Sequence, residues 1–169
     1  VNAVESGSTI EIGPFTFDVS LNVVDQEEII FNIDIEDGGQ LLQYPVSLVC
    51  SAPSYQLVSS FIFDGDNGAL DPGESADIQL IIENNGSAPL SYPTFSMYAN
   101  DDYLTMGTIN QDNAYYWETS SSIVLNLDIT VSDAAPIGHT SIVWINIGSL
   151  NTNYNHSFAL PMTIGMLIE

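Results

Sequence analysis

Oxygen-bearing side chains gather in one short stretch of the chain, FDGDNGALDPGES, which runs from Phe63 to Ser75. Five of these side chains fall within eleven residues: Asp64, Asp66, Asn67, Asp71 and Glu74. Ca²⁺ takes six to eight oxygen ligands, often from one tight loop together with backbone carbonyls. We therefore identify these five residues as a candidate metal site, with Ca²⁺ as the ion that they would bind.

The same stretch also has the residues of a solvated turn, and that interpretation stays open beside the metal site. Asn-Gly tolerates positive φ, and proline suits the second position of a turn. The spacing begins like an EF-hand loop, but Gly68 stands at its fifth position and Ser75 at its twelfth, so the stretch is not an EF-hand. Asp101 and Asp102 form a second, weaker acidic pair.

No basic side chain balances these carboxylates. The chain has 169 residues, 22 Asp and Glu, no Lys or Arg, and a formal net charge of −22. Without cations it is unsuited to bind nucleic acid or anionic lipid, so we expect neither as a partner. Each carboxylate must be solvated, hydrogen-bonded or bound to a cation from solution. Trypsin-like proteases find no cleavage site, which suits a protease-resistant protein outside the cell.

Groups that could catalyse a reaction are few. His139 and His156 both lie near predicted turns, and no zinc-protease, serine-hydrolase, Cys-x-x-Cys or aspartic-protease motif is present. The one cysteine, Cys50, lies in an apolar run and is predicted to be a small buried side chain. We therefore expect no enzymatic activity.

Aromatic side chains offer a different chemistry, the stacking of sugar rings. The candidate residues are Tyr92, Tyr98, Tyr103, Tyr115, Tyr116 and Trp117. Aromatic residues of a β-sandwich also form its core and its interfaces. A carbohydrate-binding surface is therefore the alternative to a core role for these residues, and a glycan is a candidate partner.

The elements that position these residues are predicted to be β-strands. Apolar and polar residues alternate in short runs separated by Gly, Pro, Asn, Asp and Ser, as in an all-β sandwich, and no run has the period of a helix. The runs are Phe15–Val23, Ile29–Ile35, Ala76–Asn84, Ile123–Val131, Ser141–Gly148 and Phe158–Met166. The sequence thus predicts an all-β fold with an antiparallel β-sandwich.

An internal repeat divides the chain in two. The same order of elements occurs twice: two alternating strands, then a third strand that holds a proline. The third strand is Tyr44–Ala52 in the copy near the start and Phe158–Met166 in the copy at the end. The stretch from Phe61 to Asn113 has no counterpart upstream. We therefore predict a partial sandwich at 1–54, whose strands a neighbour or the second domain completes, and a complete sandwich at 55–169, because a half-sandwich alone leaves an apolar face and free edges.

The turn and the strand after it carry a family resemblance. Asn67–Glu74 and Asn84–Gly86, followed by NDDYLTMGTI and SDAAPIGHTSIVWINI, resemble the immunoglobulin-like (CARDB-like) module of secreted bacterial surface proteins. Such modules lie behind the catalytic domains of gingipain-like and subtilisin-like peptidases. The resemblance covers roughly 55–169, and it implies a non-catalytic, often calcium-associated spacer or adhesive domain with an immunoglobulin-like β-sandwich fold.

Together these observations predict an extracellular or cell-surface structural protein. It would be either a filament subunit that assembles by β-strand complementation or a spacer module of a larger secreted protein. Its expected partners are other copies of itself or neighbouring immunoglobulin-like domains. A carbohydrate-binding or adhesive module is the alternative function.

Overall fold

The computed structural model describes residues 4–111 and 115–165, and all the regular structure in these ranges is β. The prediction of an all-β, antiparallel fold is thereby confirmed. The strands are β1 (Glu28–Asp37), β2 (Gln40–Val49), β3 (Tyr55–Phe63), β4 (Ser75–Asn84), β5 (Leu90–Ser91), β6 (Pro93–Ala99), β7 (Leu104–Gln111), β8 (Tyr116–Trp117), β9 (Ser121–Val131), β10 (Thr140–Ser149) and β11 (Asn155–Thr163). No helix in the described ranges could cross a membrane.

Strands β3 to β11 form a two-layer sandwich. One sheet has the order β3-β4-β9-β7 and the other β11-β10-β6, while β5 and β8 pair separately. Alternate side chains of the central strands fill the space between the sheets, and those of Leu80, Leu125, Ile145 and Ile147 have no exposed surface. This alternation of buried and exposed side chains is what produces the alternation of apolar and polar residues in the sequence.

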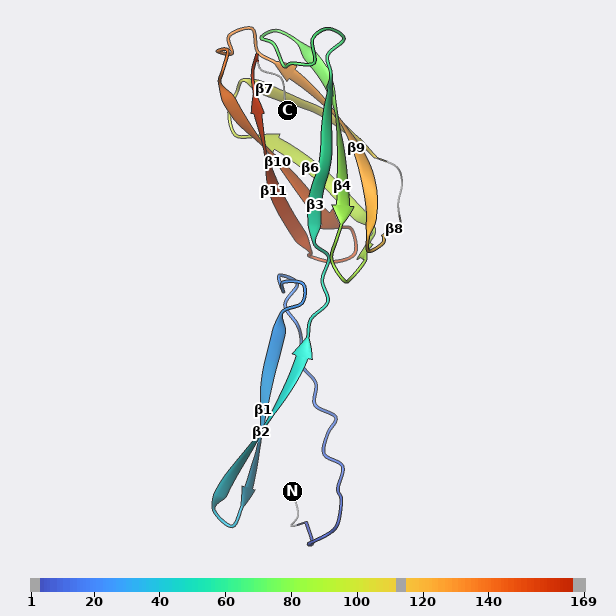
Figure 1. The fold of residues 1–169 in the computed structure, drawn as a ribbon, viewed down its shortest axis with the longest axis vertical. Coiled ribbons are helices and arrows are strands. Elements are labelled where there is room, and N and C mark those ends of the chain that lie inside the picture. Colours follow the sequence, from blue (N-terminus) through green and yellow to red (C-terminus); the bar gives the residue numbers. More distant parts are fainter. Residues whose placement is uncertain (1–3, 112–114, 166–169) are drawn as a thin grey trace.

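The β1–β2 hairpin lies apart from this sandwich and projects beyond one end of it (Figure 1). Residues 50–54 connect the hairpin to β3. All nine strands from β3 onward lie after the predicted boundary at residue 55, although the division into two domains itself stays a prediction.

One predicted strand is absent. Phe15–Val23 was expected to be a strand, but residues 9–20 form no ladder with any described residue and run beside the hairpin as extended chain (Figure 1). The alternation is present, yet the described part of the chain supplies no neighbouring strand to pair with its backbone. The other predicted runs coincide with β1, β4, β9, β10 and β11 within a few residues, and Met166 at the end of the last run lies outside the described residues.

Candidate functional site

The Asp64 carboxylate organises the first half of the acidic loop. Its two oxygens accept hydrogen bonds from the backbone N–H groups of Asp66, at 2.9 Å, and Gly68, at 2.8 Å. The bond from Asp66 is the main cause of a lowered pKa at Asp64. Gly65 and Gly68 both have positive φ, which suits a tight reversal of the chain. The carboxylate therefore stays ionised and holds the loop closed.

The second half of the loop is closed by its other polar side chains. Asn67 donates from Nδ2 to Asp71 at 2.8 Å, and Glu74 accepts from the backbone N–H of Asp71 at 3.1 Å. Between them Leu70 is fully buried in the core and forms a parallel bridge with Ile164. The buried leucine anchors the loop to the sandwich.

These contacts bear on the predicted Ca²⁺ site. The five predicted ligands lie in one loop, and four of them use their side chains in hydrogen bonds to backbone N–H groups or to one another: Asp64, Asn67, Asp71 and Glu74. Asp66 takes part only through its backbone N–H. In the described ranges, no three acidic, histidine or cysteine side chains are gathered closely enough to hold a metal ion. The hydrogen bonds account for the turn without a metal, and Ca²⁺ binding stays a prediction.

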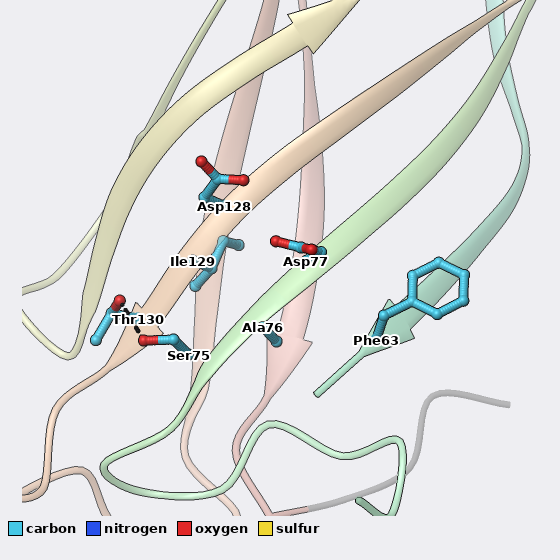
Figure 2. Close-up of a pocket in the computed structure, with 7 residues that line it drawn as sticks. All are labelled: Phe63, Ser75, Ala76, Asp77, Asp128, Ile129 and Thr130. Atoms are coloured by element: carbon cyan, nitrogen blue, oxygen red, sulfur yellow. Dashed lines mark hydrogen bonds between the residues drawn. The ribbon is translucent and has the colours of Figure 1, made fainter. Parts of the chain in front are cut away.

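A shallow depression lies on the outer face of the larger sheet, beside this loop (Figure 2). Its walls include Asp77 on β4 and Asp128 on β9, which are direct cross-strand partners. Like charges in this position are unfavourable. Asp128 accepts a hydrogen bond from Thr108, and Ser75 bonds to Thr130 at 2.8 Å. The depression is open, and these contacts assign it no chemistry.

Histidine, serine and aspartate meet near the start of β10. Asp101 accepts hydrogen bonds from Ser141 Oγ at 2.8 and 3.0 Å, and its Oδ2 lies 2.9 Å from His139 Nε2. Both side chains bind the same carboxylate, so His139 is not placed to take a proton from Ser141. The cluster ties the β6–β7 turn to β10, which is a structural role.

The aromatic residues do not form one platform. Trp117 is only 1% exposed, its ring packs on Tyr55 at 4.7 Å, and its Nε1 donates to Ser121 O at 3.0 Å. Of the two alternatives for Trp117, the core role is therefore the one that holds, and the residue is not part of a sugar platform. Tyr92, Tyr115 and Tyr116 do gather on the surface.

The remaining two tyrosines lie elsewhere. Tyr98 stacks on Trp144, and Tyr103 meets His139 edge-on. The six predicted residues thus divide among four places. The surface cluster of three tyrosines is the part of the prediction that could still contact a sugar.

The β1–β2 hairpin has the most unusual surface of the molecule. Its register places four apolar pairs on one face: Ile29 with Leu48, Phe31 with Val46, Ile33 with Tyr44, and Ile35 with Leu42. We call these eight side chains the apolar face. The opposite face is mixed. It carries the carboxylates of Glu28, Asp34 and Glu36. Three apolar side chains lie among them and are 60–62% exposed: Ile30, Leu41 and Val49. Side chains on the β2 half of the apolar face are 40–52% exposed, whereas comparable positions of β10 are fully buried.

The extended chain at residues 9–23 touches the apolar face without covering it. Phe17 packs against Phe31, with 4.9 Å between the ring centroids. From residue 9 to residue 19 the backbone makes no backbone hydrogen bond to any other described residue. Both the side chains of the hairpin and the backbone of this segment therefore lack partners that strands normally have.

The predicted internal repeat would give this geometry. Segment 9–23, β1 and β2 correspond in order to β9, β10 and β11, and in the sandwich β9 lies in the opposite sheet from β10 and β11. The contact of Phe17 with Phe31 places the segment against the apolar face of the hairpin. The counterparts of β3, β4, β6 and β7, which complete the sandwich, have no equivalents among the described residues before Tyr55.

A junction that the sequence did not reveal fixes the hairpin to the sandwich. Asp25, just before β1, accepts from the backbone N–H groups of Ala52 and Ser87, at 2.9 and 3.1 Å, and from Ser87 Oγ. The bond from Ala52 is the main cause of the lowered pKa of Asp25. One carboxylate thus joins three segments that are distant in sequence.

Asn84 completes the junction from the sandwich side. It has no exposed surface, accepts from the N–H groups of Ser54 and Gly86, and donates to the carbonyls of Ala88 and Trp117. At Gly86 an added Cβ would lie 2.4 Å from Ala52 O, so only glycine fits. The Asn-x-Gly sequence at 84–86 marked this place, but its role appears only in the fold.

Comparison with other proteins gave no assignment. No protein-family model matches the chain, and no curated protein matches it.

Proposed function

We propose that this chain is a non-catalytic structural protein that acts through its N-terminal 54 residues. In this proposal the sandwich is a stable support for the N-terminal part. The β1–β2 hairpin, with segment 9–23 lying on part of its apolar face, is an unfinished β-structure, here called the N-terminal layer, that another β-rich polypeptide completes. The observation that carries the proposal is the exposed apolar face beside an unpaired extended segment. An unfinished layer of this kind is a site for strand addition or sheet packing.

Two biological forms fit this proposal. In a filament subunit, the completing polypeptide is a neighbouring molecule. In a spacer module of a secreted surface protein, it is an adjoining immunoglobulin-like domain. The absence of Lys and Arg from the sequence supports a place outside the cell, where trypsin-like proteases act.

The proposal is tested on the full chain at low concentration. A free apolar face should bind the dye ANS, and Val46→Glu, which places a charge in its centre, should reduce that fluorescence at least severalfold. Ser47→Glu adds the same charge to the opposite face and is the matched control. Equal fluorescence in all three proteins would show that the apolar face is not free, and the proposal would fail.

Light scattering with Ca²⁺ separates the two forms. Particle growth on adding Ca²⁺, reversed by a chelator, is the result expected for a filament. A constant size is the result expected for a spacer.

A carbohydrate-binding function is the second candidate, supported by the exposed cluster of Tyr92, Tyr115 and Tyr116. The test is retention on immobilised glycans of a variant that combines Tyr115→Ala with Tyr116→Ala. Tyr98→Ala is the control, because Tyr98 is similarly exposed but stacks on Trp144 elsewhere. Loss of retention in the double variant alone would support a sugar site.

A further inference from the structure

We infer that the polypeptide completing the N-terminal layer is a second copy of this chain, docked apolar face to apolar face about a two-fold axis. This inference rests on the proposed function and names its partner. The dimer that it describes is closed, because each copy has one such layer. Three features of the structure favour this partner.

The first feature is the size of the surface. Eleven apolar side chains of the layer are 40–69% exposed: Ile10, Ile12, Phe15, Phe17, Val19, Leu21, Ile35, Leu42, Tyr44, Val46 and Leu48. Summed over the hairpin and segment 9–23, these fractions correspond to roughly 1,000 Å² of exposed surface, where the largest single patch on a typical monomer is ~300–600 Å². It is close to the ~800 Å² that each partner contributes to a standard stable interface.

The second feature is the placement of charge. Two copies that each carry a net charge of −22 repel one another, so a self-interface must avoid facing carboxylates. On the hairpin, Glu28, Asp34 and Glu36 lie on the face opposite the apolar one. Face-to-face contact therefore directs them to the outside of the dimer. The eight side chains of the apolar face include no carboxylate, so this part of the face is complementary to an identical one. Asp37 lies on the same side of the hairpin, paired with Gln40 next to the turn, and the docked copies must keep it at the edge of the interface.

The third feature is that the core of the sandwich is already filled by its own side chains. A neighbouring sandwich could accept the hairpin only if it had an apolar groove where a strand is missing. The core side chains of both sheets are instead at most 8% exposed, so the sandwich fills its own core. Outside this core the sandwich exposes single apolar side chains, such as Phe61 at 48% and Phe63 at 57% on β3, whereas the apolar face of a second copy exposes a row of them. Two such layers would stack as the two sheets of a β-sandwich do, ~10 Å apart.

Analytical ultracentrifugation of the full chain tests the inference. Across a concentration series from ~1 to ~300 μM, the mass should rise from one chain to two and stop there. Val46→Glu should weaken the dimer ~100-fold or more, because the two-fold axis places each substitution in the interface twice. Ser47→Glu should weaken it less than ~3-fold, since its charge points outward.

Two further measurements keep the test decisive if Val46→Glu disturbs the hairpin. Val46→Thr keeps the β-branched shape and adds only a hydroxyl, and it should weaken the dimer by ~10-fold. Circular dichroism should show the same strand content in every variant.

The other outcomes overturn the inference in distinguishable ways. A wild-type monomer at all concentrations whose apolar face still binds ANS would exclude a second copy and leave the proposed function standing. A monomer that binds no ANS would overturn both. A mass that keeps growing beyond two chains would replace the closed dimer by an open assembly. Equal weakening by Val46→Glu and Ser47→Glu would show that the dimer uses another surface.

Discussion

Asn84 is the side chain whose removal should have the clearest effect on stability. Replacing it by alanine leaves the N–H groups of Ser54 and Gly86, and the carbonyls of Ala88 and Trp117, without their partner. A buried polar group that loses its hydrogen bond costs about 1–3 kcal/mol. The bonds to Gly86 and Trp117 are buried and the other two are partly exposed, so we expect Asn84→Ala to lower the free energy of unfolding by about 3–5 kcal/mol.

That loss is a large share of the ~5–15 kcal/mol that stabilises a typical domain, so it should be easy to measure. The assay is urea unfolding followed by the fluorescence of Trp117 and Trp144, with the slope m compared between variants. Asn85→Ala is the control, because Asn85 is exposed and makes one long bond, 3.4 Å, to Gln56. It should change stability by less than ~0.5 kcal/mol.

A third variant separates hydrogen bonding from packing. Asn84→Asp keeps the shape and the accepting oxygen, but it turns a negative oxygen toward the carbonyls of Ala88 and Trp117. It should be at least as destabilising as Asn84→Ala. If Asn84→Ala cost less than ~1 kcal/mol, or if Asn84→Asp were tolerated, the buried hydrogen-bond network would not be what holds this junction together.

Three other perturbations test separate parts of the molecule. Burial acts to raise the pKa of Asp101, but the hydrogen bonds from His139 and Ser141 outweigh it and leave the pKa below the ordinary 3.8. Asp101 therefore stabilises the fold above ~pH 4, and this effect is lost as the pH falls through its folded pKa. In acid unfolding, the stability of Asp101→Asn should fall less steeply between ~pH 4 and ~pH 2 than that of the wild type. An unchanged profile would contradict a stabilising role for the ionised Asp101 carboxylate. Trp117→Ala should lower stability by ~3–5 kcal/mol in the urea assay, as a core substitution does, and a loss below ~1 kcal/mol would show that the ring is not core. If Ca²⁺ only screens the net charge, it should raise the melting temperature of the wild type and of Asp71→Asn equally. A rise in the wild type that is absent in Asp71→Asn would establish the metal site.

The sequence predicted strands best where one side of the strand is buried in the core of the sandwich. The alternation in 76–84, 123–131 and 141–148 follows directly from burial on one side of each strand, and it predicted β4, β9 and β10 closely. The same signal at 15–23 failed to predict a strand. Alternation reports which side chains avoid water, but it does not report whether a neighbouring strand exists to pair with the backbone.

For the candidate sites, too, the sequence revealed the local contacts and missed the long-range ones. Local turn chemistry indicated the acidic loop, because its hydrogen bonds join residues two to four apart. The Asp25 junction was invisible, since the carboxylate meets partners 27 and 62 residues away. The sequence left Trp117 open between the core and a sugar platform, because an aromatic run looks the same whether a strand turns it inward or outward.

The attachment of the hairpin has a mechanical consequence. Residues 50–54 continue directly into β3, so a pull on the hairpin along the long axis of the molecule is passed to β3 nearly parallel to its length (Figure 1). Strand β3 is paired with β4 from Tyr55 opposite Asn84 to Phe63 opposite Asp77, with one register shift between Leu57 and Ser59. Such a load would shear many ladder bonds at once instead of opening them one by one. The sandwich should therefore resist stretching applied through the hairpin better than peeling applied across it.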